Sequence, residues 1–341
     1  MARPQEKLAS SLEALKQIQD EPGMVVRSNE LSRTHRERLI ENGFLSEVMR
    51  GWYIATSPRD RPGDTTPWYA SYWNFVARYL TDRFGNDWCL SPEASFSLHA
   101  GDWSVPAQVL VRAPRGSNNP ISLPHNTSIY DMRVGLPDAK DIQVENSVRF
   151  YTATAALLTA SPGIFEQQPM NMRVVLSSQR DGSALLAKLL EGGHSVIAGR
   201  IAGAFRDIGR DRIADDILQT MNKAGYTIRE INPFREPLVF DLPKRETSPA
   251  AIRIRLMWHK LRKDVVQTFP KAPGLPNDDG AYLAHVEDAF VTDAYHSLSI
   301  EGYQVNSELI EHVRSGDWNP DSSSKDREQQ DTLAARGYWQ A

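Results

Sequence analysis

The sequence has little that would allow disulfide bonding, membrane insertion or polyanion binding by the chain as a whole. Its 341 residues include a single cysteine, Cys89, so an internal disulfide is excluded and a reducing compartment is indicated. No apolar run approaches the roughly 18 residues of a membrane span, and the first residues lack a signal-peptide core. The formal net charge is −4, so any nucleic-acid surface must be local. These absences predict a cytoplasmic protein without a membrane partner.

The remaining composition is that of a soluble globular protein, with 40% hydrophobic and 24% charged residues. A length of 341 residues predicts two or three domains with ample core. Helical and strand-like patterns are mixed along the chain, which predicts an α+β fold. Cys89 stands between Trp88 and Leu90, so we expect a small buried hydrophobe there rather than a catalytic thiol.

Residues 1–58 carry the element pattern of a winged helix-turn-helix. Ser32 is placed to cap a longer helix that Gly43 ends, and Ser28 is expected to cap a short helix anchored by Leu31. A β-hairpin is expected around Arg50. The expected elements are helix 6–19, strand 24–26, short helix 28–31, helix 33–42, and strands 44–49 and 51–56.

In such a module the longer helix enters the major groove of DNA and the wing touches the backbone. The expected DNA-contacting residues lie on that helix and at the wing, and they are Ser32, Arg33, Thr34, Arg36, Arg38 and Arg50. Arg33 and Arg36 are the expected base readers, because arginine can bind guanine through two hydrogen bonds. Leu39 and Ile40 are expected to face inward. Residues 27–61 hold seven arginines against five acids, a modest excess, so a protein-binding module with a solvated arginine face stays equally open.

The same region resembles AbiEi-type antitoxins and regulators. The matching order is Val25-Val-Arg-Ser-Asn-Glu-Leu31, then Leu39-Ile-Glu-Asn-Gly-Phe-Leu45, then Arg50-Gly-Trp-Tyr-Ile-Ala55. Further on, a Ser91-Pro-Glu-Ala-Ser95 segment precedes an apolar strand that ends in Pro-Arg-Gly116, as in the second part of those proteins. The resemblance implies an AbiEi-like α/β domain over about residues 66–234 and an antitoxin-like regulator that binds double-stranded DNA.

Three features of the middle region are expected to be structural. The aromatic helix from Trp68 to Phe84 has the spacing of a core helix. His99 has no cysteine, histidine or acid at metal-ligand spacing, so no metal site is expected there. The run from Gly192 to Gly199 lacks the Gly-Lys-Ser/Thr ending of a phosphate loop, so that function is rejected.

Two expectations concern the segments that follow. Residues 228–234 are expected to form a strand that ends the second domain. A basic helix over 250–269 is expected to present a solvated charged face, with nucleic-acid or membrane contact as the alternative. Its expected packing residues are Ile254, Met257, Leu261 and Val265.

A helix near the end of the chain carries the pattern Ser297-x-x-x-Glu301-Gly302, in which Ser297 and Glu301 share one helical face. Glu308-Leu-Ile-Glu311, Ser315-Gly-Asp-Trp318 and Ala334-Ala-Arg-Gly-Tyr-Trp-Gln340 follow it. This series resembles the N-terminal inhibitory helix and first elements of Fic-family AMP transferases, over roughly residues 281–341 within a third part at 250–341. The alternative is a solvated acid at a helix end.

The Fic resemblance implies that Ser297, Glu301 and Gly302 are autoinhibitory. Glu301 would pair with the second arginine of the core motif H-P-F-x-(D/E)-G-N-G-R-x-x-R, which otherwise binds the γ-phosphate of ATP. That core is absent here, because none of the eight histidines is followed by Pro-Phe and Gly-Asn-Gly-Arg does not occur. This chain therefore has no expected catalytic residues or cofactor of its own.

The expected partner is a Fic core, in cis or in trans, that uses ATP and Mg2+ to attach AMP to a hydroxyl side chain. Three interpretations remain open. The chain is the regulatory part of a longer AMP transferase, a complete antitoxin-like transcriptional regulator, or the remnant of a lost enzyme.

Overall fold

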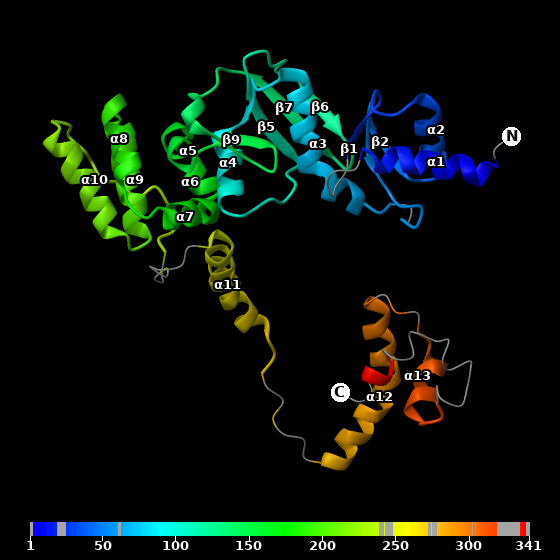
Figure 1. The fold of residues 1–341 in the computed structure, drawn as a ribbon. Coiled ribbons are helices and arrows are strands. Elements are labelled where there is room, and N and C mark those ends of the chain that lie inside the picture. Colours follow the sequence, from blue (N-terminus) through cyan, green and yellow to red (C-terminus); the bar gives the residue numbers. More distant parts are fainter. Residues whose placement is uncertain are drawn as a thin grey trace. The chain divides into compact units, whose positions relative to one another are not determined.

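The computed structural model describes residues 3–18, 25–60, 63–238, 242, 248–271, 274, 278–301, 303, 305–318 and 335–338. The chain divides into two compact units, Met1–Asp264 and Val265–Ala341. Helices and small sheets are mixed, so the predicted α+β class is confirmed (Figure 1). The finer division into a winged helix, an AbiEi-like domain and Fic elements stays a prediction.

The described residues up to position 58 form a three-stranded sheet with two helices. The bounds are α1 Pro4–Lys16, β1 Val25–Arg27, α2 Arg33–Glu41, β2 Leu45–Met49 and β3 Trp52–Ala55. The strands are antiparallel in the order β1-β3-β2, and Leu15 of α1 and Leu39 of α2 share their core. Gly43 takes a φ of +74°, which suits the residue that follows a helix end.

The predicted short helix at 28–31 is wrong. These residues form a turn, in which the Glu30 N–H donates to Arg27 O at 3.0 Å. The Ser28 N–H donates to Gly51 O at 2.9 Å, so the start of this segment is tied to the hairpin and does not enter a helix. Leu31 is nevertheless buried, as predicted.

Helix α3, Thr66–Phe84, is the element against which the three-stranded sheet and the four-stranded sheet of the first unit pack. Trp68, Tyr72, Phe75 and Leu80 are buried on it, which confirms the prediction of a core helix. Figure 1 shows α3 between the two sheets. The same hydrophobic cluster includes side chains from both, namely Val25, Trp52, Ile54, Val109, Val111 and Ile129.

The second sheet is mixed, with the strand order β4-β5-β7-β6. Its strands are β4 Cys89–Leu90, β5 Gln108–Ala113, β6 Pro120–Leu123 and β7 Thr127–Arg133, and the hairpin of β8 Ile142–Glu145 and β9 Val148–Tyr151 follows. Strands β5 and β7 are parallel, and the other neighbours are antiparallel. Burial raises the pKa of the Cys89 thiol to about 12, so Cys89 is a neutral core residue, as predicted.

The turn after β5 needs glycine at position 116. A Cβ on Gly116 would lie 2.7 Å from the backbone carbonyl carbon of Met132 in β7, a separation that no other residue allows. Close by, the buried Asp131 accepts a hydrogen bond from the Ser117 N–H at 3.1 Å. Arg83 Nη1 of α3 lies 2.8 Å from Asp131 Oδ2, as an ion pair outside hydrogen-bond alignment. These contacts fix the parallel strand pair to α3.

The rest of the first unit is mainly helical and has its own core. The helices are α4 Pro92–His99, α5 Ala153–Thr159, α6 Ile164–Gln167, α7 Pro169–Ser178, α8 Ser183–Gly192, α9 Ser195–Asp207 and α10 Asp211–Lys223. Ser91 caps α4 by accepting the Ala94 N–H at 3.2 Å. His99 Nε2 lies 2.7 Å from Tyr151 O, and burial lowers its pKa, so the neutral ring acts as a structural donor.

The predicted strand at 228–234 is wrong, because this segment lies across α9 instead of joining a sheet. Gly199 and Gly203 of α9 allow the approach, since a Cβ on them would lie 2.0 Å from Arg229 O and 2.2 Å from Ile231 O, respectively. The Ile231 N–H also donates to Gly199 O at 3.2 Å. Gly199 therefore serves helix packing, which agrees with the rejection of a phosphate loop.

Helix α11, Pro249–Thr268, is attached to the first unit through Ile252 and Leu256, which are buried in its helical core. The predicted packing residues of this helix are exposed, which corrects the prediction; they are Ile254, Met257, Leu261 and Val265. Two anchors at the helix start suffice to attach it, and they lie on a different face. Within the described part of the chain, no helix has both the length and the apolarity needed to cross a membrane.

The second unit contains α12, Asp279–Ile300, α13, Ser307–Arg314, and a helical turn at 335–338. Asn306 caps α13, accepting the Leu309 N–H at 2.7 Å. The core of the unit combines side chains from all three segments, including Ala294, Leu298, Ile310, Val313, Trp318 and Ala335. Val286, nearer the start of α12, is exposed.

Candidate nucleic-acid interface and inhibitory helix

The start of α2 presents three of the predicted DNA-contacting residues to solvent. Ser32 is the N-cap of α2, where its hydroxyl oxygen accepts the His35 N–H at 3.3 Å. Arg33 and Thr34 follow on the first turn, and all three residues are exposed. A helix start with exposed hydroxyl groups and a cation is an arrangement suited to phosphate and base-edge contacts.

Arg33 is not a free cation. Its Nε donates to Glu37 Oε1 at 2.6 Å, one helical turn further along α2. The hydrogen bond and charge of Glu37 raise the pKa of Arg33. DNA would have to compete with this pair, although an exposed pair of this kind is weak and easily exchanged.

The structure corrects the predicted exposure of Arg36 and Arg38. Arg36 Nη1 donates to Ser28 O at 2.7 Å, and its guanidinium lies 5.7 Å from the centre of the Tyr53 ring. Arg38 Nη1 donates to Lys7 O and to Ser11 Oγ, both at 2.9 Å. Arg36 thus joins α2 to the turn and hairpin, and Arg38 joins α2 to α1. Both are half-buried, and base reading by Arg36 stays a prediction.

Three further predicted positions differ in outcome. Ile40 is 39% exposed, so the prediction that it faces inward is wrong, whereas Leu39 is fully buried. Leu39 lies in the core that α1, α2 and the sheet share. Arg50 is exposed in the turn between β2 and β3, as expected for the tip of a wing.

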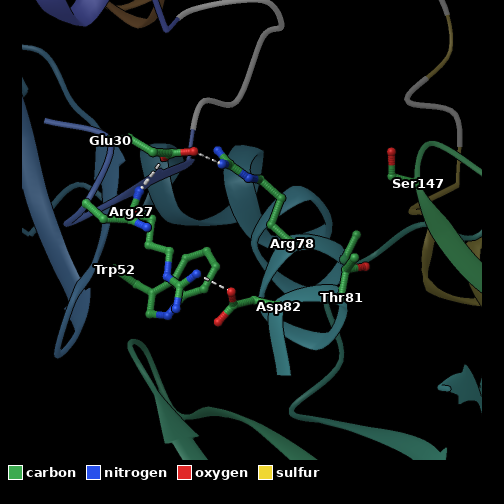
Figure 2. A pocket seen from close by; sticks show the side chains of 9 residues that line it. Arg27, Glu30, Trp52, Arg78, Thr81, Asp82 and Ser147 are labelled. Carbon is green, nitrogen blue, oxygen red and sulfur yellow. Dashed lines mark hydrogen bonds and ion pairs between the residues drawn. The ribbon is translucent and has the colours of Figure 1, made fainter. Parts of the chain in front are cut away.

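The N-terminal module is joined to α3 by a charged contact that sequence analysis missed (Figure 2). Arg27 pairs with Asp82, and Arg78 pairs with Glu30 and donates to Val25 O. These residues line a cavity of about 340 Å3 beside Trp52. The paired residues come from β1, the turn at 28–31 and α3, so no spacing within the sequence predicts that they meet.

Trp52 adds an apolar part to the same contact. Its ring lies 5.8 Å from those of Phe75 and Tyr79, both edge-to-face, and the Arg27 guanidinium lies 5.6 Å from it. Aromatic pairs of this geometry stabilise beyond simple burial. The N-terminal module, which comprises the described residues up to position 58, is therefore packed firmly against α3. A ligand that fixed the orientation of α2 would also fix that of the domain that begins with α3.

The predicted autoinhibitory residues lie at the end of α12. Ser297 is half-buried, and its Oγ lies 3.5 Å from the Tyr338 hydroxyl, which also donates to Asp293. Glu301 is the C-cap of α12 and is exposed, with its N–H donating to Ser297 O at 3.2 Å. Gly302 lies outside the described residues. Ser297 therefore faces the interior of the unit, while the Glu301 carboxylate faces solvent.

The residues present do not fit the ATP and Mg2+ of a Fic enzyme. No group of three or more histidine, cysteine or acidic side chains that could hold a metal ion occurs in the described ranges. The glycine-rich anion cradle of the core motif is missing from the sequence itself.

Comparisons with known proteins leave the family open. No family model matches the chain, and no curated protein matches it. One similar solved structure is the RV2827C protein from Mycobacterium tuberculosis, with 13% sequence identity and a TM-score of 0.41. The match covers 73% of this chain and 94% of that one. A likeness at this level assigns neither a family nor a function.

Proposed function

We propose that this chain is the regulatory part of a Fic-type protein AMP transferase, with α12 as its restraining helix and the N-terminal module as a DNA- or partner-binding element. The observation that carries the proposal is the exposed carboxylate of Glu301 at the end of α12. A restraining glutamate must be free to pair with an arginine outside its own unit, and among the described residues this carboxylate is exposed and has no ion-pair partner. Ser297, one turn earlier, is held by the unit itself.

The division of labour between Ser297 and Glu301 supports this function. Tyr338 contacts Ser297 and Asp293 on α12, and its ring lies 5.9 Å from that of Phe290. These contacts would fix the rotation of α12, and hence the direction in which Glu301 points. The test is AMP transfer by the native-length protein with and without Glu301→Gly.

The second candidate is an antitoxin-like regulator that binds double-stranded DNA. It is favoured by the exposure of Ser32, Arg33 and Thr34 at the start of α2, together with Arg50 at the tip of the hairpin. With Arg36 and Arg38 engaged inside the module, the set of candidate contacts is smaller than the sequence predicted. The two candidates are compatible, because a DNA-binding module and a restraining helix occupy different units.

In a mobility-shift assay with duplexes selected from a random-sequence pool, we expect Arg33→Ala and Arg50→Ala each to weaken binding about tenfold, because each removes one cation from the DNA-facing surface. Each should also reduce the slope of log affinity against log salt by about 1. Thermal unfolding should not change for either variant. Arg180→Ala, an exposed arginine in the helical region, is the matched control and should bind as wild type.

Arg36→Ala separates the two roles of arginine on α2. We expect its main effect to be a loss of about 1–2 kcal/mol in stability, since it removes a charged hydrogen bond and a cation–π contact. No enriched duplex at all would contradict the DNA-binding candidate. Normal stability with lost binding in Arg36→Ala would show that Arg36, not Arg33, reads the DNA.

A further inference from the structure

Helix α11 has two apolar faces, and the first unit covers only one of them. Ile252 and Leu256 are buried in the helical core. On another face, four large apolar side chains recur at the spacing i, i+3, i+4 and i+7, and their exposed fractions are high: Ile254 65%, Met257 40%, Trp258 60% and Leu261 51%. We call these four residues the α11 stripe. An uncovered stripe of this size marks an interaction site.

Basic residues surround the α11 stripe. Arg255, Lys260, Arg262 and Lys263 are exposed, while Arg253 is already paired with Asp102 at 3.0 Å. Asp264 is the one acid within the bounds of α11. The exposed part of the helix is therefore cationic as well as apolar, so its binding partner must supply negative charge.

We propose that the α11 stripe binds an acidic amphipathic helix of a partner protein. Four apolar anchors over two helical turns match the way in which an amphipathic helix seats on an apolar surface. The charge of α11 selects acidic residues beside the anchors of the partner. A second copy of α11 would bring like charges together and is disfavoured by the same argument. This inference does not depend on the proposed AMP-transferase or DNA-binding function.

The test uses the full chain and a fluorescein-labelled designed peptide of roughly 18 residues, about 27 Å of helix. The peptide carries leucine at positions that repeat the i, i+3, i+4, i+7 spacing and glutamate elsewhere. Its matched control replaces every glutamate with lysine. Fluorescence anisotropy should show that the glutamate peptide binds at least about tenfold more tightly than the lysine peptide, with the difference shrinking in high salt.

Variants of the chain locate the binding site. Leu261→Asp and Trp258→Ser should each weaken peptide binding at least about tenfold, because each removes an anchor of the stripe. Both positions are exposed, so circular dichroism should confirm unchanged folding. Val196→Asp changes an apolar residue of α9 that is 71% exposed, and it should leave binding unchanged.

The proposal would be overturned if both peptides bound equally or if neither bound. Binding that survives Leu261→Asp and Trp258→Ser would also overturn it. So would sedimentation as a dimer that Leu261→Asp dissociates. Binding to vesicles of phosphatidylcholine and phosphatidylserine, without binding to the glutamate peptide, would assign the stripe to a lipid surface and would equally overturn it.

Discussion

Replacing Gly203 with alanine is expected to lower the free energy of unfolding by about 2 kcal/mol or more. The added Cβ would lie 2.2 Å from Ile231 O, a backbone atom that cannot rotate away. The segment is also held in place, since the Ile231 N–H donates to Gly199 O and Glu230 pairs with Arg206 at 2.7 Å. Helix propensity alone favours alanine by about 1 kcal/mol, so the clash must outweigh that gain.

Chemical denaturation by urea measures this change, and Gly135→Ala is its matched control. Gly135 has no atom within 4 Å of an added Cβ, and its φ is not in the left-handed region. The same substitution there should be neutral or stabilising by a few tenths of a kcal/mol. A Gly203→Ala protein as stable as wild type would mean that residues 228–232 do not rest on α9.

Replacing Asp131 with alanine is expected to lower stability by about 2–3 kcal/mol. The Asp131 carboxylate is fully buried, accepts the Ser117 N–H and hydroxyl, and lies 2.8 Å from Arg83 Nη1. Its removal leaves the Ser117 donors without an acceptor. Arg83 loses less, because about a third of its side chain is exposed and can be hydrated.

An exposed ion pair in the same region provides the control for Asp131. Asp87 lies 3.9 Å from Arg115, and both side chains are about two-thirds exposed. Asp87→Ala should therefore change the free energy of unfolding, measured by urea denaturation, by less than about 0.5 kcal/mol. Asp131→Asn, which keeps an oxygen for Ser117 but removes the charge, should fall between the two. Equal effects of Asp131→Ala and Asp87→Ala would contradict the assignment of Asp131 as a buried brace.

Local patterns predicted most helices correctly. The aromatic repeat of α3 and the serine cap of α2 each place an element within a few residues of its observed bounds. These signals work because they depend on neighbours along the chain. The turn at 28–31 was missed because its conformation depends on Gly51, which lies in the hairpin.

Contacts between segments that are far apart in the chain could not be predicted from the sequence. Helix α2 reads Arg-Thr-His-Arg-Glu-Arg before Leu39, and no contrast in polarity there reveals that Arg36 and Arg38 turn inward. Their partners, Ser28 O and Lys7 O, are backbone oxygens that leave no mark in the sequence. The same holds for the 228–234 segment, which was predicted to be a strand although it packs against Gly199 and Gly203 of α9.

The exposure of the candidate residues was predicted in part, and their roles stay predictions. Arg33, Thr34, Ser32 and Arg50 are exposed as the DNA-binding interpretation requires, and Ser297 and Glu301 lie at the end of α12 as the resemblance implied. The charged contact between β1 and α3 was not foreseen, because Arg27, Asp82, Arg78 and Glu30 meet only in the folded chain (Figure 2). The contact of Tyr338 with Ser297 likewise joins segments far apart in sequence.

The most direct test of the proposed function is AMP transfer from radiolabelled ATP by the native-length protein, purified from its own cells. We expect a low rate that Glu301→Gly raises at least about tenfold, since a charge-assisted pair contributes about 1.5–3 kcal/mol to the restrained state. Glu287→Gln, which changes another exposed acid of α12, should leave the rate low. A rate that is the same in wild type and Glu301→Gly, or no AMP transfer by either, would contradict the proposed function.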